Sequence, residues 1–201
     1  MDLIETVKQM GVVGAGGAGF PTHIKLGNRV EIVIANGTEC EPLLFNDKYI
    51  LKEHGNEVIQ GLKAVLQVTG AKKGIIALKK KQVQIVEQIK SFIAGQENIT
   101  LTLLDDFYPA GDEQILVYMT TGRVINQGQL PIAVGCLVNN VETLRNIYFA
   151  TLGKPVTRRT LTCIGEVKNP QVVIARIGMS IGDVISECGG ALVDDPAVIV
   201  G

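Results

Sequence analysis

Short apolar runs alternate with longer stretches of helical periodicity through the middle of the chain. The pattern predicts strands, rich in Val, Ile and Leu, at residues 31–35, 74–78, 99–104 and 136–138. Helices are predicted at residues 45–54, 56–69 and 82–94, after the 105–113 loop to about residue 121, and from Asn139 or Asn140 to Gly153. Strands that alternate with helices are typical of an α/β fold with a mostly parallel sheet.

The first 30 residues follow a different pattern. A short helix is expected over residues 2–9, because Asp2 can cap it and Glu5 follows three positions later. A second short helix is expected from Pro21 to Lys25, since proline suits a first helical turn. The segment between them, GVVGAGGAG, is too rich in glycine for regular structure and predicts a loop.

The pattern changes again near residue 156. Two strands are expected, at 156–167 and 171–177, with a turn at KNP between them. Ser180 is expected to cap a helix that ends at Gly189, and AVIV (197–200) to form a further strand. This order is typical of a β-grasp. We therefore expect an α/β domain over residues 1–155 and a β-grasp domain over residues 156–201, incomplete because the chain belongs to a longer protein.

Composition narrows the function classes. Hydrophobic residues make up 46% of the chain and the net charge is −1, which excludes a disordered protein. The 19 basic and 20 acidic residues balance, which argues against nucleic-acid binding through bulk charge. No apolar run approaches the ~20 residues of a membrane-spanning helix. The four cysteines lack the paired spacing of metal sites, so we expect no metal and the reduced thiols of a cytoplasmic protein.

Polar loops follow three of the predicted strands. NGTECEP (36–42) follows the first strand, YPAGDE (108–113) the third, and NNVET (139–143) the fourth. Parallel α/β sheets bind ligands at the carboxyl ends of their strands. The sequence therefore predicts a ligand site where these loops meet.

The glycine-rich segment 14–19 contains the pattern G-x-G-x-x-G. Glu39 has the spacing of the acid that follows this pattern in dinucleotide-binding folds, but only Val12 and Val13 could form the strand that must precede it. The loop can instead let a flat ligand or a phosphate approach the backbone, or it can be a structural turn. Lys25 can pair with such a phosphate or simply be solvated.

Acidic residues cluster in two of these loops. Glu39 and Glu41 flank Cys40, which makes that thiol a poor nucleophile because negative neighbours disfavour a thiolate. Asp112 and Glu113 come after Gly111 at the end of the second loop. The carboxylates suit the sugar or ring end of a nucleotide, or they form exposed charged loops.

Asparagine and histidine add little chemistry by themselves. Asn139 and Asn140 can cap the helix that follows them, and a helix N-terminus can also hold a phosphate. His23 and His54 are expected to lie at the surface or to pack, and neither is expected to act as a general base.

Four segments, GAGGAGFPTHIKL, NGTECEP, YPAGDEQ and VNNVETL, occur in this order and at similar spacing in the flavoprotein family of the complex I NADH-binding subunit. Over residues 8–153 the chain resembles the RnfC-like branch of that family. Residues 164–190 resemble the soluble ligand-binding β-grasp (SLBB) domain that follows in these proteins. The resemblance implies a bound FMN that takes hydride from NADH and passes single electrons to iron–sulfur clusters.

The resemblance also implies site residues, position by position. Those for FMN are Gly14, Gly16, Gly17, Lys25, Asn36, Thr38, Glu39, Cys40, Gly111, Asp112, Asn139, Asn140 and Thr143, with Lys25 toward the phosphate. Those for NADH are Phe20, Glu41 and Glu113. No catalytic acid or base is implied, because hydride moves from nicotinamide to flavin and the protein supplies positioning, here by Glu41 and Glu113.

Two positions depart from the complex I subunit. Ala15 stands where that subunit has arginine, as in the RnfC-like branch, and Asp112 is shorter than the family's glutamate. The family's cluster-binding cysteines lie beyond the β-grasp, so iron–sulfur clusters are expected outside this chain. The electron acceptor stays open among a ferredoxin, a cobalamin and a proline-reductase system, with the protein cytoplasmic or at the periphery of a membrane complex.

Two other functions remain open. One is a non-catalytic scaffold whose β-grasp binds a partner or a ligand such as a corrinoid, with a vestigial flavin site. The other is a dehydrogenase of the Rossmann type, which would bind NAD without flavin.

Glu41 and Glu113 would repel a 2′-phosphate near them, which favours NADH over NADPH.

Overall fold

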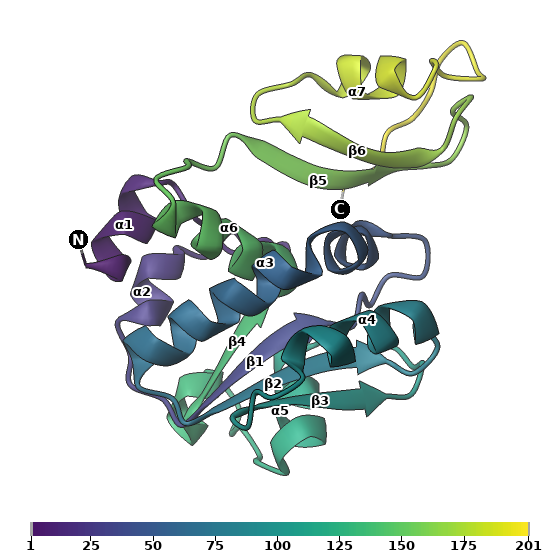
Figure 1. Ribbon diagram of the computed structural model, residues 1–201. Helices are drawn as coiled ribbons and strands as arrows, with labels where there is room; N and C mark the ends of the chain where they lie inside the picture. Colours follow the sequence, from purple (N-terminus) through teal and green to yellow (C-terminus); the bar gives the residue numbers. More distant parts are fainter. Residues whose placement is uncertain (1, 201) are drawn as a thin grey trace.

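A four-stranded parallel sheet forms the centre of the first unit in the computed structural model, which describes residues 2–200 (Figure 1). Its strands are β1 (Ile32–Gly37), β2 (Lys73–Lys79), β3 (Ile99–Leu104) and β4 (Cys136–Asn140), in the spatial order β3-β2-β1-β4. The register places Asn36 of β1 beside Ala77 of β2 and Asn140 of β4. The predicted parallel sheet is confirmed, with β1 and β4 each ending two residues later than the sequence indicates.

Helices cover both faces of this sheet. One face carries α3 (Asn46–Thr69), α4 (Val83–Ile93) and α6 (Val141–Thr151), and the other carries α5 (Glu113–Thr121) and a 3₁₀ turn, η1 (Pro131–Val134). Because side chains alternate along a strand, Val33 packs toward α3 while Ile34 packs toward α5. Both are fully buried. Strands covered on both faces explain why the sequence shows continuous apolar runs.

The break predicted between helices 45–54 and 56–69 is present as a kink within α3. His54 has a non-helical backbone there, with φ of −131°, so α3 consists of two helical parts on either side of it. Gly61 of α3 lies against α6, and a Cβ there would sit 1.9 Å from the carbonyl oxygen of Leu144. Among the helices of residues 2–200, none combines the length and the apolar character that crossing a bilayer requires.

Two short helices precede the sheet, as predicted. They are α1 (Leu3–Gln9), capped by the Asp2 side chain, and α2 (Thr22–Leu26), which starts after Pro21. The glycine-rich loop between them is closed at its base by a single antiparallel bridge from Val13 to Pro21. The loop therefore leaves and re-enters the first unit at nearly the same place.

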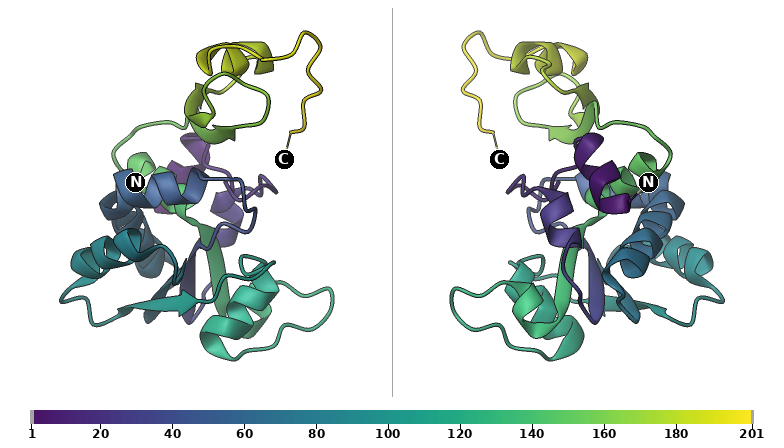
Figure 2. Two further views of the ribbon diagram at one scale, coloured as in Figure 1. Left: turned by 90° about the vertical axis from the view of Figure 1, so that its right-hand side faces the viewer. Right: turned by 90° about the vertical axis from the view of Figure 1, so that its left-hand side faces the viewer.

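The second unit is a two-stranded antiparallel sheet with one helix. Its elements are β5 (Arg158–Cys163), β6 (Gln171–Arg176) and α7 (Ile181–Glu187), the last capped by Ser180 as predicted. The strand predicted at residues 197–200 is wrong, because this segment pairs with no strand of the described residues. Figure 2 shows it as an extended tail that descends beside the second unit and is separated from β5 and β6, and Ile199 is 96% exposed. A β-branched run becomes a strand only where a neighbour can accept its hydrogen bonds.

Backbone and side-chain hydrogen bonds join the two units. The Val156 N–H donates to the Met10 carbonyl oxygen over 2.9 Å. The Thr162 hydroxyl accepts from the Phe45 N–H at 3.0 Å and donates to Asn46 Oδ1 at 2.8 Å. Strand β5 therefore lies along the side of the first unit where α3 begins.

Candidate functional site

The loops after β1 and β3 are locked to each other at the carboxyl edge of the sheet. The Asn36 Nδ2 donates to the Gly111 carbonyl oxygen over 2.9 Å, and the Gly111 N–H donates to the Cys40 Sγ, also over 2.9 Å. A Cβ at Gly111 would lie 2.7 Å from both the Cys40 Sγ and the Thr38 Oγ1, so only glycine fits there. The Asn36 Oδ1 accepts from the Thr38 N–H and hydroxyl. These predicted site residues thus build the frame on which the two loops rest.

The glycine-rich loop reaches the same edge from the N-terminal side. The Ala15 N–H donates to the Thr143 Oγ1 over 2.8 Å, which ties the loop to the first turn of α6. Gly16 approaches Asn140, since a Cβ on it would lie 3.5 Å from the Asn140 Cβ. Gly17 has φ of +118°, is exposed, and has open space where a Cβ would point. Bare backbone therefore faces outward where the loop meets β4.

The position of this loop in the chain bears on the Rossmann alternative. The loop lies between α1 and α2, ahead of β1, instead of between a strand and its following helix. Before the loop, Val13 makes only an isolated bridge. The strand that a dinucleotide fingerprint requires is therefore absent from the described residues at this point.

The two asparagines at the end of β4 differ in how their side chains are used. The Asn140 Oδ1 accepts from the Glu142 N–H and caps α6, as predicted, while its Nδ2 donates to the Asp47 Oδ1 at 2.8 Å. Asn139 is only 4% exposed, and its Nδ2 has no hydrogen-bond partner within residues 2–200. A buried donor without an acceptor costs roughly 1–3 kcal/mol. Asn139 thus offers a free donor that a ligand carbonyl or phosphate oxygen can satisfy.

Lys25 lies beside two of the residues predicted to contact NADH. Its ammonium is 2.9 Å from the Glu113 Oε1, donates to the Val138 carbonyl oxygen at 3.1 Å, and lies 5.9 Å from the centre of the Phe20 ring. The Lys25 and Glu113 side chains are 28% and 42% exposed. A partly exposed ion pair contributes about 0–1 kcal/mol, so a phosphate can compete with Glu113 for the lysine.

Two carboxyl groups, of the half-buried Glu39 and the buried Asp47, lie near the same edge. The Glu39 Oε2 accepts from the Asp47 N–H over 2.8 Å, and Glu39 adopts φ of +33°. Burial raises the pKa of Glu39. Burial first, and then the nearby charge of Glu39, raise the pKa of Asp47 to about 7. Asp47 was not predicted as a site residue, because an acid in the first turn of a helix is an ordinary surface pattern.

The remaining predicted residues occupy the rim or lie elsewhere. The Asp112 Oδ1 accepts from the N–H groups of Gln114 and Ile115, so this carboxylate caps α5. Glu41 is exposed. His23 lies half-buried in α2, and the His54 Nδ1 lies 3.4 Å from the Glu57 Oε1 along α3.

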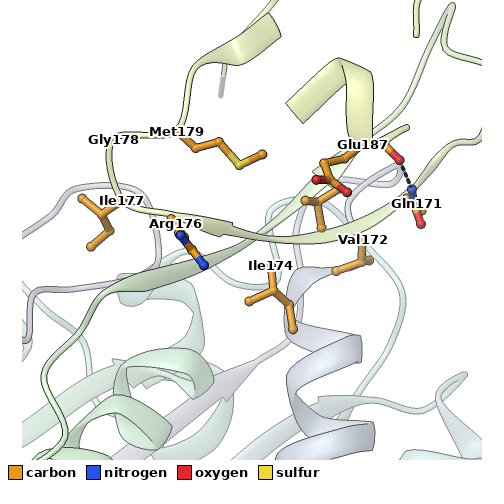
Figure 3. A pocket seen from close by; sticks show the side chains of 9 residues that line it. Gln171, Val172, Ile174, Arg176, Ile177, Gly178, Met179 and Glu187 are labelled. Atoms are coloured by element: carbon orange, nitrogen blue, oxygen red, sulfur yellow. Dashed lines mark hydrogen bonds between the residues drawn. The ribbon is translucent and has the colours of Figure 1, made fainter. Parts of the chain in front are cut away.

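A separate hollow of about 730 Å³ lies along β6 of the second unit (Figure 3). Its lining includes Ile174 and Arg176 from the strand and Glu187 from the end of α7. The Gln171 Nε2 donates to the Glu187 carbonyl oxygen across one end of it. None of the residues predicted for FMN or NADH lines this hollow.

The residues at the carboxyl edge fit an FMN molecule. The group carries carbonyl and phosphate oxygens and a flat ring system, and the edge presents the unpaired Asn139 amide, a cation at Lys25 and an unobstructed backbone at Gly17. The N-terminus of α6 at the same edge favours an anion. The donors at this edge match the acceptors of a mononucleotide.

Comparisons with known proteins show the family of the chain. Residues 7–149 match the Nuo51 FMN-binding domain, and residues 162–198 match the SLBB domain. The chain is 44% identical over 201 residues to the cobalamin reductase PduS of Salmonella typhimurium. It is 36% identical over 207 residues to a component of the Na⁺-translocating ferredoxin:NAD⁺ oxidoreductase complex of Acetobacterium woodii. The alignments cover 100% and 98% of this chain, but 44% and 47% of those relatives.

Solved structures share the fold. Crystal structures of an NAD⁺-reducing [NiFe]-hydrogenase in the H₂-reduced and air-oxidized states superpose with TM-scores of 0.83 and 0.81, at 23% and 24% identity. Each match covers 94% of this chain and 39% of the other. The domain matches leave a gap before residue 162, so the division between residues 155 and 156 stays a prediction. The chain is consistent with the RnfC-like branch that its motifs resemble. It belongs to the Nuo51 FMN-binding domain family, and an SLBB domain follows the FMN-binding domain in the chain.

Proposed function

We propose that this chain is the flavin-bearing part of an NADH-oxidising electron-transfer protein. It would hold FMN at the carboxyl edge of the sheet, receive hydride from NADH there, and pass electrons to an acceptor outside the chain. The observation that carries the proposal is that all four family segments converge on one edge, where the buried Asn139 amide has no protein partner among the described residues. FMN supplies hydride acceptance and one-electron release, and the chain supplies binding and orientation.

The roles of the residues follow from their places. The backbone at Gly14, Gly16 and Gly17 would let the flat ring system approach without side chains in the way. Lys25 would exchange part of its contact with Glu113 for the phosphate, and Asn139 would donate to an acceptor on the ligand. The hydrogen bond between Asn36 and Gly111 would keep the two loops in one conformation, so that they lose little conformational entropy when the ligand binds.

NADH would approach from the exposed side of this edge. Phe20 is 38% exposed and offers an aromatic surface beside Lys25. Glu41 is exposed on the neighbouring loop, and the Glu113 carboxylate accepts a hydrogen bond from Lys25. Carboxylates here would accept hydroxyl or amide donors of the dinucleotide and would repel a 2′-phosphate, so we propose NADH over NADPH.

The onward acceptor would lie outside this chain. The chain spans about 44% of the length of its PduS relative. One relative is named a cobalamin reductase and another belongs to a ferredoxin:NAD⁺ oxidoreductase complex. We propose iron–sulfur clusters, a ferredoxin, a cobalamin or a proline-reductase system as the kinds of acceptor, in the cytoplasm or at the periphery of a membrane complex.

The test is anaerobic reconstitution of the chain with FMN, followed by visible spectra before and after NADH. We expect a protein-bound flavin spectrum that NADH bleaches. Retention of FMN that dithionite reduces but NADH does not would contradict NADH as the donor. A protein that holds no FMN would contradict the proposal and favour the scaffold function. Riboflavin in place of FMN provides the matched control, because it lacks the phosphate assigned to Lys25.

A further inference from the structure

Strand β5 of the second unit sends one side chain into the glycine-rich loop of the first. The guanidinium of Arg159 donates a hydrogen bond to the carbonyl oxygen of Ala15, which lies between Gly14 and Gly16. The same guanidinium forms an ion pair with the Glu142 Oε2 at 3.1 Å. The residues in contact are 144 positions apart along the chain, so the contact depends on how the two units pack.

The partner carboxylate is buried and fully engaged. The Glu142 side chain is 3% exposed, and its Oε1 accepts from the backbone N–H of Thr160, the residue after Arg159, over 2.9 Å. Both oxygens of Glu142 thus bind β5, one through a side chain and one through the backbone. A buried carboxylate held in this way fixes the position of the guanidinium.

Ala15 is held through both of its backbone polar groups. Its N–H donates to Thr143 of α6, and its carbonyl oxygen accepts from Arg159 of β5. The glycines on either side have no Cβ to restrict their backbone. Ala15, which is buried, therefore fixes the loop at a point beyond its base, where the Gly14 N–H donates to the Phe20 carbonyl oxygen.

We infer that Arg159 is a positioning residue of the flavin site, through which the second unit sets the conformation of the glycine-rich loop. The inference rests on the proposed function for the identity of the ligand, but the loop contact itself does not depend on it. A loop with a fixed backbone loses less conformational entropy when it binds a ligand, so removal of the guanidinium should weaken binding without any direct contact to FMN.

A matched control lies next to it on the same strand. Arg158 is exposed, and its side chain projects to the opposite face of β5 because side chains alternate along a strand. Replacement of either residue by methionine removes the charge and keeps much of the length. R159K retains a charge but loses the forked donor geometry, so we expect an intermediate result.

The first measurement is amide hydrogen exchange on the ligand-free chain. We expect exchange at residues 14–20 to speed up about tenfold or more in R159M, because opening of the loop becomes easier, and to stay at the wild-type rate in R158M. Exchange in β2 and α4 serves as the internal reference and should be unchanged. Equal exchange at residues 14–20 in the two variants would overturn the inference.

The second measurement is titration of the apo chain with FMN, followed by flavin fluorescence. We expect the Kd to rise about tenfold in R159M and to stay within about twofold in R158M. If wild type binds no FMN while loop exchange responds as expected, the proposed function fails and the loop contact stands. If wild type binds FMN and R159M binds it equally well, the positioning role fails. Should R159M not fold, the same comparison between R159K and R158K decides the question.

Discussion

The Nδ2 of Asn140 donates a hydrogen bond to the Oδ1 of Asp47 over 2.8 Å. This contact joins the residue that caps α6 to the first turn of α3, at the edge where the predicted site residues gather. Burial and the charge of Glu39 raise the pKa of Asp47, because both disfavour its charged form. The hydrogen bond from Asn140 favours the charged form and lowers the pKa. The burial of Asp47 therefore makes stability depend on pH.

The substitution Asp47→Asn should change that dependence. The folded chain holds a proton on Asp47 up to a pKa of about 7, whereas the ordinary value is 3.8. Tighter proton binding by the folded chain adds to its free energy of unfolding. This contribution is fully present below about pH 4 and is lost as the pH rises toward 7. Urea unfolding should show the free energy of unfolding of wild type, relative to D47N, falling over this range by at most about 1.4 kcal/mol per pH unit. A constant difference between the two proteins would contradict the pKa assignment.

The substitution Gly61→Ala should be strongly destabilising. The new Cβ would lie 1.9 Å from the Leu144 carbonyl oxygen, so α3 and α6 would have to separate. We expect a loss of about 3 kcal/mol or more in the free energy of unfolding. Gly27→Ala is the control, because its Cβ would meet the Ile24 carbonyl oxygen at an ordinary 3.5 Å. Similar losses in both variants would show that helix contact is not the reason for glycine at position 61.

The substitution Gly17→Ala should affect ligand binding more than stability. Gly17 and Gly165 have φ of +118° and +100°, and a Cβ on either would meet no atom within 4 Å. Alanine at each position should therefore cost a similar ~1–3 kcal/mol of backbone strain. Only G17A should raise the Kd for FMN, by about tenfold, since only Gly17 lies in the proposed site. Flavin fluorescence titration of both variants tests this, and equal affinities would remove Gly17 from the site.

The substitution Lys25→Gln should separate the phosphate from the ring system. A charge-assisted contact contributes about 1.5–3 kcal/mol, so the Kd for FMN should rise roughly tenfold or more. Riboflavin, which has no phosphate, should bind K25Q about as well as it binds wild type. Lys8→Gln, on the exposed side of α1, is the control for loss of a positive charge. Equal weakening of FMN and riboflavin would indicate that Lys25 supports the loop instead, through Val138 and Glu113.

The sheet could be predicted from the sequence because its strands are buried on both faces and appear as continuous apolar runs. The end of β1 could not be predicted from the sequence. Gly37 predicts a loop, yet the residue lies in the strand, where a Cβ would come within 2.8 Å of both Leu51 and Leu78. Glycine serves close packing there instead of a turn, and only the packed structure distinguishes the two uses.

The candidate site also has parts that could be predicted from the sequence and parts that could not. The loops after the strands could be located from topology, because parallel strands place their carboxyl ends together. Asp47 and Arg159 could not be identified, since an acid at a helix start and an arginine in a strand are common surface patterns. Their roles depend on the burial of Asp47 and on the contact of Arg159 with the first unit, which local sequence does not encode.

The parallel order of β1 to β4 leaves the opposite edge of the sheet free of the proposed site. The turn from α4 to β3 lies on that edge, and Glu97 within it is exposed. A linker attached at residue 97 would hold the molecule on a surface with the edge of the proposed site toward the solution. The chain thus has a side for immobilisation that leaves the proposed site open to dissolved ligands.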